Sequence, residues 1–123
     1  MEGPVPGVPR GGGIMDNATV IARLHEMGPL PDASTAAVDS FQFLAFDELV
    51  QQLTAPLSKA HAIALINLGP PPDTGSLEVE WALIHAVDLL SAEDLQEAVL
   101  LANDTEVKRI VEIRLANYFK RNP

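Results

Sequence analysis

The sequence contains no cysteine, which excludes disulfide bonds, zinc–thiolate sites and cysteine nucleophiles. Long apolar runs are absent as well: the longest, 62–66 and 98–102, have five residues each, whereas a transmembrane helix needs about 20. The first residues also lack the basic region and apolar core of a secretory signal. We therefore expect a protein of the reducing cytoplasm that does not associate with a membrane.

Basic residues are scarce, with eight Lys and Arg against 17 Asp and Glu, for a net charge of −9. They are also unevenly placed: residues 1–106 carry three bases and sixteen acids, whereas residues 107–123 carry five bases and one acid. Binding to nucleic-acid phosphates needs a concentrated basic face, so this balance argues against a nucleic-acid partner. An acidic surface suits a basic protein partner, or serves solubility alone.

Motifs of catalysis and cofactor binding are missing too. Each of Ser58, Ser76 and Ser91 stands where a helix cap is expected, and no Gly-x-Ser-x-Gly elbow surrounds a serine. The glycine triplet 11–13 lacks the Gly-Lys-Ser/Thr ending of a phosphate-binding loop. We expect no cofactor, and the pattern favours a non-enzymatic role without excluding an enzyme.

What the sequence does contain is helical periodicity, in a chain whose 47% hydrophobic content is typical of a globular protein. We predict an all-α fold of five to six short helices, either a compact bundle or stacked hairpins. Residues 1–15 are predicted to form a flexible leader, because 1–13 hold three prolines and five glycines. Residues 16–123 are predicted to form a single helical domain.

Caps, turn residues and apolar spacing predict where the helices begin and end. The predicted helices are 16–27, 34–53, 58–68, 77–90, 92–102 and 105–119. Two alternatives stay open, because 62–68 has the composition of a buried strand and 92–119 can form one continuous helix. The proline-rich loop 69–75 is predicted to be an extended spacer between the third and fourth helices.

The segment Asp104–Arg109, with the sequence Asp-Thr-Glu-Val-Lys-Arg, resembles the start of the second helix in helical repeats of the HEAT type. The resemblance covers a short part of the chain, and the sequence holds no second copy of it. A repeat array needs about three stacked units. The resemblance therefore implies a helical hairpin near the C-terminus, and nothing about the remainder of the chain.

Three residues of the fourth predicted helix, Glu78, His85 and Asp88, are spaced so that they can share one helical face. Such a face suits one edge of a metal site, or a histidine poised for proton transfer. However, the chain has neither paired Glu-x-x-His motifs nor a His-Glu-x-x-His motif. We favour a solvated histidine–carboxylate pair without a metal, and keep a metal-binding protein or small enzyme as the alternative.

The last predicted helix has an apolar stripe with an arginine, Arg114, in its middle. The stripe consists of Val107, Ile110, Val111, Leu115 and Tyr118. A lone buried guanidinium would cost several kcal/mol, so this arginine needs an explanation. Three stay open: an internal pair with Asp47, Glu48 or Asp88, a side chain whose charged end reaches water, or an interface with a partner.

If the stripe is an interface, tyrosine and arginine are the residue types enriched at such sites. The predicted partner-binding residues are then Arg114, Tyr118, Phe119 and Arg121. We expect a small acidic protein–protein interaction module, an adaptor or regulatory subunit, whose partner is another protein; homo-oligomers are compatible with the sequence. An alternative is an inhibitor, immunity-type or chaperone-like protein that masks a basic partner.

Overall fold

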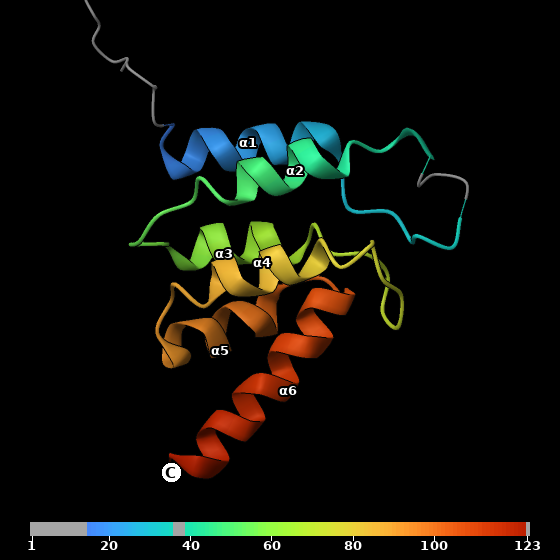
Figure 1. Ribbon diagram of the computed structural model, residues 1–123. Coiled ribbons are helices and arrows are strands. Elements are labelled where there is room, and N and C mark those ends of the chain that lie inside the picture. The colour runs from blue at the N-terminus through green and yellow to red at the C-terminus, as the bar shows by residue number, and fades with distance from the viewer. Residues whose placement is uncertain (1–14, 36–38, 123) are drawn as a thin grey trace, which may run out of the picture.

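Three helical hairpins stacked in layers form the protein in the computed structural model, which describes residues 15–35 and 39–122 (Figure 1). The six helices of these residues are α1 (Asn17–Met27), α2 (Phe43–Val50), α3 (Lys59–Ile66), α4 (Glu80–Val87), α5 (Ala92–Leu101) and α6 (Glu106–Arg121). The predicted all-α class is therefore confirmed. Met15 is half-buried against the core, and the rest of the predicted leader lies outside the described residues.

Each hairpin pairs a first helix with a second one: α1 with α2, α3 with α4, and α5 with α6. The first helices α1, α3 and α5 pack on one another in that order, and so do the second helices α2, α4 and α6. In Figure 1 the second helices lie in front of the first ones. Of the two predicted arrangements, the structure thus has the stacked hairpins.

Four of these helices begin at a side-chain cap. A backbone N–H three residues ahead donates a hydrogen bond to each cap, and these caps are Asp16, Ser58, Ser91 and Thr105. Such a bond satisfies one of the N–H groups that a helix start leaves unpaired, and contributes roughly 1 kcal/mol. Gly28, with a φ of 88°, ends α1 as predicted, because glycine adopts this conformation without steric cost.

One continuous cluster of buried residues runs through all three hairpins. Among the described residues it contains a single aromatic side chain, Phe46, and is otherwise aliphatic. Its largest fully buried side chains are Phe46, Leu24, Leu30, Leu65, Ile66, Leu68, Leu83, Ile84, Val20, Val87, Val107 and Val111. Burying a side chain of this kind contributes about 1.5–3 kcal/mol, so the layers are held together mainly by this cluster.

Hydrogen bonds between loops also tie the hairpins together, at the right-hand edge of the stack in Figure 1. The N–H of Leu30 donates to the carbonyl oxygen of Leu68 over 2.8 Å. The N–H of Asn103 donates to the side-chain oxygen of Asn67 over 2.7 Å. Each of these bonds joins one hairpin to the next, so the layers are aligned by contacts between residues that are distant in sequence.

The second helix is much shorter than the predicted 34–53, because α2 covers only Phe43–Val50. The side chain of Asp32 accepts hydrogen bonds from the N–H and the hydroxyl of Ser34, which forms a turn where the prediction has a helix. The chain has to cross from the first helices to the second helices before α2 can start. Residues 36–38 of the predicted helix lie outside the described residues.

The fourth helix is also shorter than the predicted 77–90, and Ser76 is not its cap. The Ser76 side chain is buried, and its hydroxyl donates to the carbonyl oxygen of Pro31 in the α1–α2 loop. Leu77 and Glu78 have φ angles of 52° and 68°, in the left-handed region that a right-handed helix does not include. The serine thus joins two loops, and α4 starts further along the chain.

The structure decides both alternatives that the sequence leaves open. Residues 62–66 lie inside α3, so the strand interpretation is wrong. The continuous helix over 92–119 is wrong as well, because α5 ends at Leu101 and Thr105 caps a separate α6. The helical hairpin implied by the resemblance to HEAT-type repeats is the α5–α6 pair.

Candidate protein-interaction surfaces

The arginine in the α6 stripe is held by an ion pair. An N–H of the Arg114 guanidinium donates to Oδ2 of Asp88 over 2.6 Å, which joins α6 to the residue after α4. Asp88 is one of the three predicted carboxylate partners. The two side chains are 44% and 39% exposed, so Arg114 is both paired and in contact with water. An ion pair this exposed contributes about 0–1 kcal/mol, which leaves the fold independent of it.

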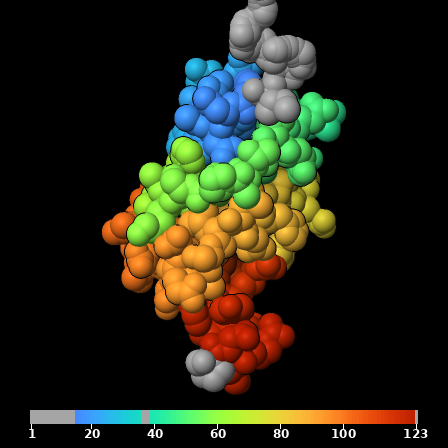
Figure 2. Space-filling model, turned by 90° about the vertical axis from the view of Figure 1, so that its left-hand side faces the viewer, coloured from blue at the N-terminus to red at the C-terminus, as the bar shows by residue number. Residues whose placement is uncertain are grey.

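The second half of α6 projects from the stack. This helix has 16 residues, whereas α4, on which it packs, has 8. Its last turns therefore extend beyond the other helices, as the red end of the chain shows in Figures 1 and 2. Tyr118 in these turns is 44% exposed, and its ring meets the half-buried ring of Phe119 edge-on, with the centroids 5.3 Å apart.

Two grooves flank Leu115 at the base of these projecting turns. The first has a volume of about 240 Å³ and lies between α6 and the start of α5, with Arg114 and Tyr118 in its wall. The second, of about 340 Å³, lies between α5 and α6, with Leu100 and Phe119 in its wall. Aliphatic residues form most of the remaining lining of the first groove, so it can receive an apolar side chain. The second groove also has Gln96 and Glu112 in its wall and is more polar.

Three of the four predicted partner-binding residues are thus brought together. Arg114 and Tyr118 share one groove, and Phe119 lines the other. Arg121 is exposed in the last turn of α6, where a cation interacts favourably with the unpaired carbonyl groups of a helix end. Leu100, beside Phe119, is 75% exposed and was not predicted, because a leucine inside a helical pattern normally indicates the core.

The helical face predicted for Glu78, His85 and Asp88 is not formed. α4 starts after Glu78, whose φ of 68° lies outside the helical region. Asp88 is engaged by Arg114. Within residues 15–35 and 39–122, no three His, Asp or Glu side chains are grouped so that they could hold a metal ion. The geometry on which the metal-site hypothesis depends is therefore lacking in the described part of the chain.

A second exposed surface lies on α2 and α4, and sequence reasoning missed it. Trp81, the one tryptophan of the chain, is 38% exposed, and its ring centroid lies 6.1 Å from that of His85. His85 and Leu89 line a groove of about 180 Å³ between α2 and α4, and Leu89 is 41% exposed. The spacing of Trp81, His85 and Leu89, four residues apart, is the sequence signal that places them on one helical face.

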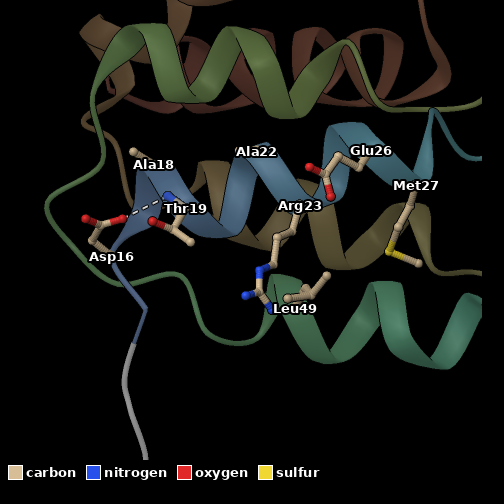
Figure 3. Close-up of a pocket in the computed structure, with 8 residues that line it drawn as sticks. All are labelled: Asp16, Ala18, Thr19, Ala22, Arg23, Glu26, Met27 and Leu49. Atoms are coloured by element: carbon tan, nitrogen blue, oxygen red, sulfur yellow. Dashed lines mark hydrogen bonds between the residues drawn. The ribbon is translucent and has the colours of Figure 1, made fainter. Parts of the chain in front are cut away.

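A wide hollow of about 780 Å³ lies at the other end of the stack, between α1 and α2 (Figure 3). Its floor is shallow because Ala18 and Ala22 have small side chains, and Arg23 reaches from α1 towards α2. Asp16 at one end accepts a hydrogen bond from the N–H of Thr19 over 2.8 Å. Hydrogen bonds from Thr19 hold the pKa of Asp16 below its ordinary value. This carboxylate therefore serves the start of α1.

A buried carboxylate connects α6 to the loop that precedes α4. The Glu106 side chain is 8% exposed and accepts hydrogen bonds from Nε of Arg109 over 2.8 Å and from the N–H of Asp73 over 2.6 Å. The hydrogen bond from Arg109 is the main reason why the pKa of Glu106 is lowered, so the carboxylate is ionised at neutral pH. These contacts give the cluster a structural role.

Comparison with known proteins found no matching family model, no matching curated protein and no matching solved structure. The resemblance to HEAT-type repeats thus stays limited to the hairpin that α5 and α6 form. Among the described residues, no helix combines the length and apolar content that crossing a bilayer requires. Function has to be argued from the surfaces themselves.

Proposed function

We propose that this chain is a small acidic protein–protein interaction module, an adaptor or regulatory subunit that binds its partner with the projecting half of α6. The observation that carries this proposal is the exposure of Tyr118 and Arg114 beside an apolar groove of about 240 Å³. Tyrosine and arginine, together with tryptophan, are the residue types that most often dominate binding energy at interfaces. The lack of cysteine suits the reducing cytoplasm, which is the location we propose.

The arrangement has the parts that an interface needs. Apolar walls around Leu115 form a centre that a partner's side chain can fill, and the Tyr118–Phe119 pair adds aromatic area. Lys120 and Arg121 at the helix end provide a polar rim, where charges steer association. These features provide contact area and charge, which binding needs, and they include no group placed for a chemical step. They therefore favour binding rather than catalysis.

A second candidate is an inhibitor, immunity-type or chaperone-like protein that masks a basic partner. The observation in its favour is that residues 60–107, which include α4 and α5, contain no Lys or Arg. Such a surface attracts a basic protein and speeds its approach more than it strengthens the final complex. An association rate that does not change with ionic strength would exclude this candidate.

Affinity capture from a native lysate tests the role of α6. Four tagged proteins are compared: the wild type, Arg114→Glu, Tyr118→Ala and Arg23→Glu. The last is a matched charge reversal on α1, at the opposite end of the stack. We expect the wild type and Arg23→Glu to retain the same stoichiometric partner, and the two α6 variants to lose it.

Circular dichroism and thermal unfolding establish that each variant is folded before capture is compared. Arg114→Glu is expected to fold, since the ion pair that it breaks is half-exposed. Should it unfold, the pair is structural, and Tyr118→Ala alone decides whether α6 binds a partner. Equal recovery of one partner by all four proteins would show that the projecting half of α6 is not the binding site.

A further inference from the structure

The outward surface of α2 and α4 has its own apolar residues, separate from those of α6. We call it the α2–α4 face and define it by Leu44, Glu48, Trp81, His85 and Leu89. Leu44 and Trp81 are 71% and 38% exposed, on two helices that pack against each other. Both helices lie at the front of the molecule in Figure 1. Large apolar side chains are therefore exposed on helices that pack against the core, and not only in the last turns of the chain.

A groove between the two helices gives this face a place for an anchoring side chain. Its volume is about 180 Å³, and the small residues Ala82 and Ala86 leave it open. His85 and Leu89 stand beside it, and both are exposed. Sites for small-molecule ligands usually measure about 300–1,000 Å³. The groove is therefore suited to one side chain of a protein partner rather than to a separate ligand.

The charged residues of α2 and α4 themselves, His85 aside, are all acidic. Neither α2 nor α4 contains Lys or Arg, whereas Glu48 and Glu78 are exposed on α2 and next to the start of α4. Two cations are held in ion pairs: Lys59 pairs with Glu97 over 2.7 Å between α3 and α5, and Arg114 pairs over 2.6 Å with Asp88, the residue before Leu89. The exposed side chains of the α2–α4 face are thus apolar or acidic, apart from His85.

We propose that the α2–α4 face binds a cationic amphipathic helix of another protein. The apolar side of such a helix places one side chain in the groove and others against Leu44 and Trp81, the mode in which helices dock into apolar grooves. Its Lys or Arg residues face Glu48 and Glu78, and one of them can lie over the indole ring. The inference rests on the interaction role proposed above but uses a different surface, so the two can fail separately.

Synthetic peptides of about 18 residues, five helical turns, provide the probe. One peptide carries Leu at helical spacing with Lys at the polar positions, a second replaces every Lys by Glu, and a third scrambles the first. Trp81 is the only tryptophan of the chain, so its fluorescence reports on this face alone. We expect a saturable change in Trp81 emission with the Leu/Lys peptide, weakened by added salt, and no saturable change with the other two.

Substitutions then locate the site, with a dye-labelled Leu/Lys peptide followed by fluorescence anisotropy. Trp81→Ala, and separately the double substitution of Glu48→Lys with Glu78→Lys, are expected to weaken binding by about tenfold or more. Both changes are on exposed positions, so the fold is expected to persist and is checked by thermal unfolding. Leu101→Ala, which shortens a 74% exposed leucine at the end of α5, is the matched control and is expected to bind as the wild type does.

Four results would overturn the inference. These are no saturable binding of the Leu/Lys peptide, equal binding of the scrambled peptide, equal binding of the Leu/Glu peptide, and a loss with Leu101→Ala in place of Trp81→Ala. Light scattering without peptide tests whether a second copy of this chain occupies the face instead. A dimer that Trp81→Ala abolishes would show that it does. None of these results bears on capture through the projecting half of α6.

Discussion

Replacing Glu106 with glutamine tests how the last hairpin is attached to the rest of the stack. The Glu106 carboxylate is 8% exposed and accepts hydrogen bonds from the Arg109 guanidinium and from the N–H of Asp73. Glutamine has nearly the same shape but carries no charge, and one of its two polar atoms is a donor. Glu106→Gln therefore breaks the charge-assisted bonds without leaving a cavity.

The exposure of the two partners decides the expected magnitude. Removing one partner from a fully buried ion pair costs about 3–5 kcal/mol. The Arg109 side chain is 44% exposed, so water relieves most of the penalty on its unpaired charge. What remains is the loss of hydrogen bonds to a charged group, about 1.5–3 kcal/mol. For the control Asp88→Asn, whose pair is exposed on both sides, we expect about 0–1 kcal/mol.

Urea unfolding followed by circular dichroism measures both free energies of unfolding. Its pH dependence tests whether charge is the cause. The pKa of Glu106 is lowered from 4.5, chiefly by the hydrogen bond from Arg109. The ionised carboxylate thus stabilises the fold fully above pH 4.5, and this contribution is lost as the pH falls through the lowered pKa. The difference in stability between wild type and Glu106→Gln should therefore shrink in acid.

Two results would refute this reasoning. At neutral pH, Glu106→Gln could prove no less stable than Asp88→Asn, and burial of the carboxylate would then have no energetic consequence. Alternatively, the difference between wild type and Glu106→Gln could stay constant down to about pH 3, which would show that shape and not charge makes the glutamate important.

Three further substitutions are measured by the same urea titration. Gly69→Ala places a Cβ 2.7 Å from Cγ2 of Val107 and is expected to destabilise by about 1–3 kcal/mol; an unchanged midpoint would contradict this close approach. Thr105→Ala removes the α6 cap and a bond to the Ile66 carbonyl, for about 1–2 kcal/mol, and full stability would show that the cap is dispensable. Arg114→Glu is expected to cost about 1 kcal/mol or less, and unfolding would contradict its exposed geometry.

Local signals in the sequence predict much of the helical structure correctly. Ser58 and Ser91 cap the helices that they were expected to cap, because a cap bonds to a backbone N–H three residues away. The same holds for Gly28, whose conformation ends α1. In each case the residues that determine the boundary are neighbours in the chain, so no knowledge of the fold is needed.

Two of the predictions that failed depend on a partner far away in the sequence. Ser76 has the composition of a cap, but its hydroxyl bonds to Pro31, 45 residues earlier, and α4 starts later as a result. The predicted face of Glu78, His85 and Asp88 fails for the same reason, since it assumed that the helix includes Glu78. A serine has the same tendency to cap a helix whether or not a distant loop offers its hydroxyl another acceptor. Only the packing of the loops decides which of the two hydrogen bonds forms.

Helical spacing and caps act over a few residues, so the helical class, most helix starts and the apolar stripe of α6 with Arg114 in its middle can be read from the chain alone. Three features emerge only from the packing of the helices: their stacking as three hairpins, the pairing of Asp88 with Arg114, and the exposure of Trp81. Apolar residues follow the same helical spacing in the sequence whether or not a neighbouring layer covers them. Which faces are covered is settled by the packing of the layers, and that packing leaves the projecting half of α6 and the α2–α4 face open to solvent.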